Sequence, residues 1–249
     1  MRKLTLLISV LFVFVNNSFS QDKSSTDKSS TDKGSKDKGY IAISLSSSTP
    51  TGDFGSKDIN NSSAGLAKTG TSFDISFAYK FGKSFGLSAM IRRQANPVDN
   101  QVLLDELYKE NPTVSWTVDS KDWTIGGLLF GGYGSFPIGQ GKTSFDARAM
   151  IGFLHASSPD ITLTGVQGGT SAWVKLNSAS ATSFSYLFGA GFKFNVGSKV
   201  CLLLNLDYLG SSPEFQNVKT TTSIGTSDTR TFKQSFGTIN FGVGVGLRL

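Results

Sequence analysis

Apolar and polar residues alternate without a break along the end of the chain, from position 237 to the last residue. The apolar face of this segment carries Ile239, Phe241, Val243, Val245, Leu247 and Leu249. Successive side chains of a strand point to opposite sides of a sheet, so a strict period of two predicts a strand with one apolar face. If this strand pairs with the first strand of the chain, the sheet closes and no edge stays unpaired.

Earlier segments show the same period of two. They cover residues 40–46, 72–81, 85–93, 123–137, 143–155, 183–196 and 200–209. With the terminal strand they make eight, and this repeated, individually weak signal is typical of a transmembrane barrel. The sequence therefore predicts an all-β fold, an eight-stranded antiparallel up-and-down transmembrane β-barrel. The glycine-rich segment 123–137 leaves open which of its faces points inward.

The connections between these segments alternate in length. Short glycine-bearing turns are expected at 82–84, 139–141 and 197–198, and long polar segments at 47–71, 94–122, 156–182 and 210–235. Short turns at one end and long loops at the other are typical of outer-membrane barrels, whose turns lie in the periplasm. Both termini would then be periplasmic. The spacing of Val102, Leu103, Glu106 and Leu107 predicts a short helix within 99–110.

The period of two does not say whether the apolar face meets lipid or the inside of a soluble barrel. The polar faces are built from glycine, serine and asparagine, whereas a solvent-exposed face is normally dense in lysine and glutamate. These faces also carry charges of both signs, at Asp74, Lys80, Arg92, Asp146, Arg148, Lys193, Asp207 and Arg248. We expect a lumen charge network that plugs the barrel, since eight strands leave an interior that side chains fill. A narrow channel and a soluble periplasmic ligand-binding barrel are the alternatives.

The start of the chain has a different composition. Residues 1–20 combine Arg2 and Lys3 with a short apolar run, which predicts a cleaved signal peptide and secretion. Residues 21–38 repeat Asp, Lys, Ser and Thr and predict a disordered tether, so the barrel would occupy 39–249. The formal net charge of +6 is spread along the chain, and we expect no nucleic-acid partner. Cys201 is the only cysteine of the sequence, so an internal disulfide cannot form.

Several segments carry a family resemblance. They are the signal ending Ser-Phe-Ser-Gln, the segments 48–54 (STPTGDF) and 152–159 (GFLHASSP), and the C-terminal GVGVGLRL. In these the chain resembles the small outer-membrane β-barrel proteins of Bacteroidetes, similar in architecture to the OmpA and OmpX barrels. The resemblance implies a Gram-negative outer-membrane location, insertion by the barrel-insertion machinery, contact with outer-membrane lipid and a structural or surface-interaction role. We expect a monomer, with any surface ligand bound by the long loops.

One motif admits catalysis. The segment 153–157 resembles the Phe-x-His-x-Ser pattern of the outer-membrane lipid A deacylase, which implies His155 as base and Ser157 as nucleophile. Hydrolysis also needs an acid to orient the imidazole, and the nearest carboxylate, Asp160, lies in a predicted loop. The glycines of 126–134 lack the Lys-Ser/Thr of a phosphate loop. We therefore expect no catalysis, no cofactor and no metal, with the lipid-modifying enzyme kept as an alternative.

Overall fold

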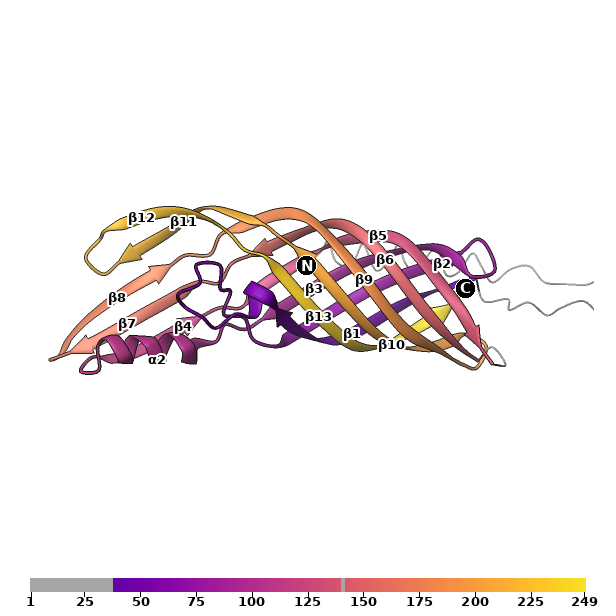
Figure 1. Ribbon diagram of the computed structural model, residues 1–249, viewed down its shortest axis with the longest axis horizontal. Helices are drawn as coiled ribbons and strands as arrows, with labels where there is room; N and C mark the ends of the chain where they lie inside the picture. Colours follow the sequence, from indigo (N-terminus) through magenta and orange to yellow (C-terminus); the bar gives the residue numbers. More distant parts are fainter. Residues whose placement is uncertain (1–37, 140–141) are drawn as a thin grey trace, which may run out of the picture. The chain divides into compact units, whose positions relative to one another are not determined.

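Eight strands close into an antiparallel barrel in the computed structural model, which describes residues 38–139 and 142–249 (Figure 1). The barrel strands are β1 (Gly39–Thr51), β2 (Gly70–Lys80), β3 (Phe85–Asn96), β5 (Trp123–Ile138), β6 (Thr143–Ser157), β9 (Ser180–Val196), β10 (Val200–Ser211) and β13 (Phe236–Arg248). Strands β1 and β13 pair along their length, from Tyr40 opposite Arg248 to Thr51 opposite Gly237. The predicted eight-stranded barrel, closed by its last strand, is confirmed. The predicted signal peptide, and the tether up to residue 37, lie outside the described residues.

The barrel strands extend further at the loop end than predicted. β1 continues to Thr51 and β9 begins at Ser180. The added residues of β1 are rich in serine and threonine, so their alternation is invisible in hydropathy, yet they pair fully with β13. Strand lengths range from 11 residues in β2 to 17 in β9, so each strand is at least as long as the 9 to 11 residues that a tilted strand needs to cross a bilayer.

A second sheet is built from the connections at the loop end. It contains β4 (Ser115–Ser120), β7 (Ile161–Gln167), β8 (Thr170–Leu176), β11 (Glu214–Thr222) and β12 (Ser227–Lys233), in the order β12-β11-β8-β7-β4. Figure 1 shows it continuing beyond one end of the barrel. The long connections 94–122, 156–182 and 210–235, predicted as polar loops, therefore contain strands that the sequence did not predict. These strands are short and rich in threonine, so their hydropathy alternates weakly although threonine favours strands.

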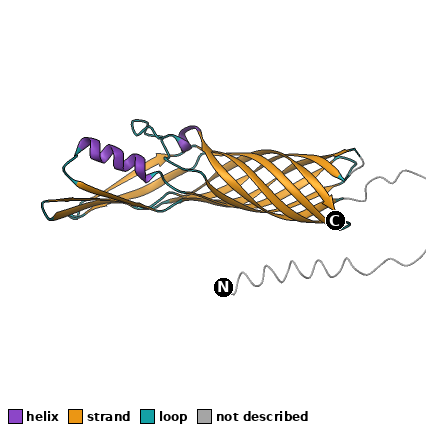
Figure 2. Cartoon of the chain, turned by 90° about the horizontal axis from the view of Figure 1, so that it is seen from below, coloured by secondary structure: helices purple, strands orange, loops and turns teal. Residues whose placement is uncertain are grey.

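The same connections hold the helical elements. Helix α2 (Asn100–Glu110) confirms the short helix predicted within 99–110, and the 3-10 turn η1 (Gly52–Gly55) follows β1. Figure 2 shows α2 alongside the second sheet. Within residues 38–139 and 142–249, no helix combines the length and the apolar character that crossing a membrane requires.

The apolar side chains of the barrel strands point outward. On β13, Phe241 and Val243 are 55% and 60% exposed, while the alternating Gly242 and Gly244 are buried. A soluble ligand-binding barrel would instead turn its apolar face inward. β5, whose facing the sequence leaves open, turns Ile125 and Leu129 inward and Phe130 outward.

Candidate functional site

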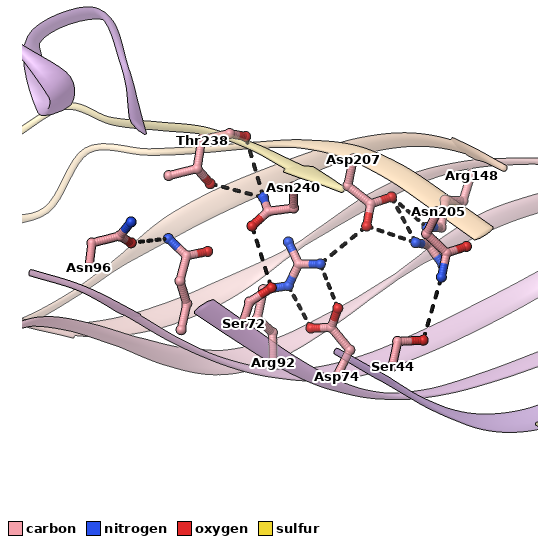
Figure 3. Close-up of polar contacts among 11 residues, drawn as sticks. Ser44, Ser72, Asp74, Arg92, Asn96, Arg148, Asn205, Asp207, Thr238 and Asn240 are labelled. Carbon is pink, nitrogen blue, oxygen red and sulfur yellow. Dashed lines mark hydrogen bonds and ion pairs between the residues drawn. The ribbon is translucent and has the colours of Figure 1, made fainter. Parts of the chain in front are cut away.

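A cluster of four buried charges lies inside the barrel (Figure 3). Arg92 on β3 donates from Nε and Nη2 to the carboxylate of Asp74 on β2, at 2.6 and 2.7 Å. The Arg92 Nη2 also reaches Asp207 on β10 at 3.2 Å. Arg148 on β6 donates to both oxygens of Asp207 at 2.7 Å. We call these four residues the ion cluster.

The ion cluster has no net charge, because two arginines face two aspartates. Its side chains are almost inaccessible: Arg92, Asp74 and Asp207 are each at most 2% exposed. Removing charges from water costs several kcal/mol per ion, and only close pairing with further hydrogen bonds offsets this cost. The forked guanidinium groups supply both, since each binds a carboxylate through two nitrogens. The ion cluster therefore ties β2, β3, β6 and β10 together across the lumen.

The other predicted members of the lumen charge network lie apart from the ion cluster. Asp146 accepts hydrogen bonds from the hydroxyls of Tyr133, Ser135 and Ser144, at 2.7 to 2.9 Å. Lys193 is buried, with its Nζ 5.7 Å from the ring centre of Tyr40.

Two cations of the predicted network lie near the turn end. Lys80 is buried at the last residue of β2. Arg248 donates from Nη1 to the carbonyl oxygen of Gly197, in the turn between β9 and β10. The structure thus brings Asp74, Arg92, Arg148 and Asp207 into one cluster and places Asp146, Lys80, Lys193 and Arg248 elsewhere.

Amides and hydroxyls fill the lumen around the ion cluster. Asn240 donates to the hydroxyl of Thr238 at 3.0 Å, and Ser72 donates to Asn240 at 3.4 Å. Towards the loops, Asn96 donates to the carbonyl oxygens of Ser48 and Lys68. These bonds give buried polar atoms partners and connect strands that are distant in sequence.

An aromatic cluster lies at the loop end of the lumen. It consists of Trp123, Phe54, Phe215 and Phe236, which we call the aromatic cap. The ring centres of Phe54 and Phe236 are 4.5 Å apart, and Trp123 packs edge-on against both. The Trp123 Nε1 donates to the carbonyl oxygen of Gly65 at 2.9 Å, which fixes the ring. Phe54 and Phe215 are fully buried.

The turn end of the lumen holds a smaller apolar cluster, made of Tyr40, Ala42, Ala78, Tyr133, Cys201 and Leu203. Along β10 the inward side chains run from Cys201 and Leu203 through Asn205 and Asp207 to Leu209, which belongs to the core at the loop end. The ion cluster is therefore enclosed between two apolar layers. The sequence analysis did not predict the aromatic cap. The available signal was the presence of single aromatic residues, such as Phe54 and Phe215, within otherwise polar segments.

His155 and Ser157 do not form a catalytic pair. Both lie on the outward face of β6 near the loop end, but each bonds across to β9. His155 Nδ1 is 3.1 Å from the Thr182 hydroxyl, and the Ser157 hydroxyl is 2.8 Å from that of Ser180. Among the described residues, no carboxylate hydrogen-bonds to the imidazole.

Asp160, the carboxylate that follows His155 and Ser157 most closely in sequence, has other partners. It pairs with Lys121 at 2.8 Å and accepts the backbone N–H of Ser178 at 2.6 Å. The Lys121 hydrogen bond and then the Ser178 N–H lower the pKa of Asp160. On the other side of the junction between barrel and sheet, Lys57 lies 2.7 Å from Asp99 and lowers its pKa in the same way. These two ion pairs fasten the connections where the second sheet begins.

The described part of the chain contains no group of three or more His, Cys, Asp or Glu side chains placed to hold a metal ion.

No protein-family model and no curated protein matches the sequence. Among solved structures, the chain is similar to Ail, the attachment invasion locus protein of Yersinia pestis, at 16% identity and a TM-score of 0.45, over 86% of this chain and 99% of Ail. It is similar to Neisserial surface protein A at 13% identity and a TM-score of 0.41, over 85% and 97%. A major outer membrane protein from Thermus thermophilus gives 7% identity and a TM-score of 0.47, over 85% and 99%. At identities this low, a shared function does not follow from the resemblance.

Proposed function

We propose that the chain is an integral outer-membrane protein of Gram-negative type, in which a closed barrel anchors a folded sheet at the cell surface. The observation that carries this proposal is the outward apolar belt. Every barrel strand presents at least two large apolar side chains with a third or more of their surface exposed, such as Ile43 and Leu45 on β1. Soluble monomers rarely expose contiguous apolar patches beyond a few hundred Å². A lipid bilayer is the solvent that suits such a surface.

Aromatic side chains support the same orientation in lipid. Phe73 and Phe184 lie outward towards the loop end, and Phe85 and Phe194 towards the turn end. Aromatic residues gather at both interfaces of membrane barrels because their rings suit the boundary between lipid and water. The tight turns then lie in the periplasm together with both termini, after secretion through the signal peptide of residues 1–20.

The filled interior of the barrel favours a role as a membrane anchor over a role as a channel. The ion cluster and the apolar layers on either side of it fill the lumen with paired or packed side chains. An aqueous path would have to break buried ion pairs and displace the aromatic cap. We propose that the barrel does not conduct, and that any surface activity belongs to the second sheet.

Catalysis is not part of this proposal. The lipid-modifying alternative needs His155 to activate Ser157 while a carboxylate orients the imidazole. Both residues bond to β9 instead, and Asp160 is committed to Lys121 and Ser178. We expect His155→Ala to leave the acylation pattern of outer-membrane lipid unchanged by mass spectrometry. A change in that pattern would support the lipid-modifying enzyme instead.

Fractionation and gel migration test the membrane assignment. We expect recovery in the outer-membrane fraction and faster migration before boiling than after it, because a closed barrel stays folded in detergent. Recovery as a soluble periplasmic protein would overturn the proposal. In planar bilayers we expect no conductance steps above those of protein-free membranes.

Protease treatment of intact cells tests the exposed sheet. The β11–β12 turn is the most accessible target, since Ile224 is 84% exposed. We expect cleavage within 222–226 while the barrel stays protected. Protection of that turn in intact cells, with cleavage only after the cells are opened, would reverse the proposed topology.

A further inference from the structure

The second sheet has two unlike faces. Residues that pair directly across strands share a face, and one face collects the pairs Val118 with Leu163 and Leu163 with Val174. Ile161 and Leu176 pair on the same face, closer to the barrel. We call this the groove face. The opposite face carries mainly threonine and charged residues, including Thr162, Thr164, Lys175, Lys219 and Thr229.

Two cavities lie along the groove face and share part of their lining. The one next to the barrel has a volume of about 380 Å³, and the distal one about 570 Å³. Leu163 and Val174 line both, so the two cavities adjoin each other, and we call them together the groove. Helix α2 forms a side wall along its length, with Leu103 lining the first cavity and Leu107 the second. Figure 2 shows the helix running along the sheet.

The groove ends at the barrel and does not enter it. Trp123 lines the inner cavity and is also the centre of the aromatic cap. Its ring is 5% exposed and packs against Phe215 and Phe236 below. The groove is therefore a blind site, open to the outside and separate from the lumen.

One cation, Arg230, lies among the apolar and uncharged polar residues that line the two cavities. Arg230 on β12 lines the inner cavity, and its guanidinium lies 5.6 Å from the ring centre of Phe232. Among the described residues, no carboxylate lies within ion-pair distance of Arg230. Asp228, two residues earlier on the same face, instead accepts the backbone N–H of Thr229. The guanidinium fork is thus available to a ligand, held over an aromatic ring.

We propose that this groove binds a long-chain fatty acid, with the carboxylate on Arg230 and the hydrocarbon chain against Leu163 and Val174. Each cavity volume falls in the range of about 300–1,000 Å³ typical of small-molecule sites. Two neighbouring cavities that share Leu163 and Val174 give a long hydrocarbon chain apolar contacts in both. A guanidinium binds a carboxylate through two parallel hydrogen bonds, which fixes one end of such a ligand. The site lies outside the barrel, so this inference goes beyond the proposed membrane role and does not depend on it.

Photocrosslinking tests the site on the full-length protein in lipid nanodiscs. The probe is palmitic acid with a diazirine on its chain, and the crosslinked peptides are mapped by mass spectrometry. We expect crosslinks within β7 and β8, at 161–176, that excess unlabelled palmitate removes and excess hexadecanol does not. Crosslinks confined to the outward faces of the barrel strands would show partition into lipid only and would overturn the proposal.

Matched variants separate the two parts of the site. Arg230→Gln removes the guanidinium, and Lys219→Gln makes the same change of charge on the neighbouring strand but on the opposite face. We expect about a tenfold loss of crosslinking in Arg230→Gln, as for one lost charge-assisted hydrogen bond, and no loss in Lys219→Gln. Equal crosslinking in all three proteins would overturn the carboxylate site.

A second variant tests the apolar part. Leu163→Asn puts an amide at the point where the two cavities meet, and we expect it to lower crosslinking by more than fivefold. Its fold is checked independently by migration before and after boiling. A folded variant that crosslinks as strongly as the parent protein would place the hydrocarbon chain elsewhere.

Discussion

Asp207 pairs with two arginines inside the barrel. It accepts hydrogen bonds from Arg92 and from Arg148, which approach from different walls. The geometry differs from a surface ion pair, where solvent screens the charges and the contribution is about 0 to 1 kcal/mol. Because all the partners are buried, loss of this one side chain leaves Arg148 without its counterion.

We therefore expect Asp207→Ala to lower the free energy of unfolding by about 3–5 kcal/mol, the usual cost of leaving a buried charge unpaired. The measurement is urea-induced unfolding in lipid vesicles, followed by tryptophan fluorescence. The matched control is Asp228→Ala, which removes an exposed carboxylate on β12 and should cost no more than about 0.5 kcal/mol. Equal losses in the two variants would mean that the ion cluster does not stabilise the barrel.

Removal of the whole pair gives a second check on the same cluster. Arg148→Leu combined with Asp207→Leu leaves Arg92 bonded to Asp74, so no charge is stranded. Buried ion pairs can often be replaced by apolar residues at little cost. We expect this double variant to be more stable than Asp207→Ala alone, and a double variant that is less stable would argue that Asp207 acts through hydrogen bonds other than those to Arg148.

At the scale of the element, the outward face of a barrel strand and the polar face of the second sheet meet different solvents. Val243 on β13 and Thr229 on β12 are both exposed. We expect Val243→Arg to cost about 2–4 kcal/mol in vesicles, because a charge near the bilayer midplane loses its hydration. Thr229→Arg should change stability by less than about 0.5 kcal/mol. Similar costs at the two positions would contradict a lipid-facing barrel.

The ion pair at the base of the sheet predicts a response to acid. The ordinary pKa of an aspartate is 3.8, and the Lys121 hydrogen bond lowers the pKa of Asp160 in the folded chain. The carboxylate therefore contributes stability that is fully present above pH 4 and is lost as pH falls through the lower, folded pKa. Stability falls with falling pH because the unfolded chain, with its higher aspartate pKa, binds the proton more readily than the folded chain.

We expect amide exchange at Ser178, corrected for intrinsic rates, to accelerate below pH 4, since its N–H donates to Asp160. Asp160→Asn should exchange faster at pH 6 and lose most of this dependence on pH. A parent protein whose Ser178 exchange does not change between pH 6 and pH 3 would mean that the pair does not hold the junction.

The barrel strands were predictable because their period of two survives in hydropathy, as Phe241 and Val243 alternate with glycines. The second sheet was not, because strands such as β12 alternate threonine with charged residues and give no apolar signal. The polar faces indicated which charges share a side of each strand, among them Asp74, Arg92 and Asp207. Their division into an ion cluster and separate sites was not predictable, since it depends on strand register. The aromatic cap joins Phe54 with Phe215, contacts that no local pattern reveals.

At the scale of the whole chain, the placement of apolar and polar side chains is that of a membrane barrel. The barrel turns its apolar residues outward, fills its interior with paired polar groups and carries a sheet beyond one end. We infer that the outward face of the barrel lies in lipid while the second sheet lies in water.

Spin labels test this claim most directly. The buried Cys201 is first replaced by alanine, and single cysteines at Val243 and Thr229 are labelled in protein reconstituted into bilayers. Electron paramagnetic resonance then compares collisions with oxygen, which concentrates in lipid, and with a water-soluble nickel complex. The account predicts that the label at position 243 meets oxygen and is shielded from nickel, and that the label at position 229 meets nickel. Free access of nickel to the label at position 243 would contradict it.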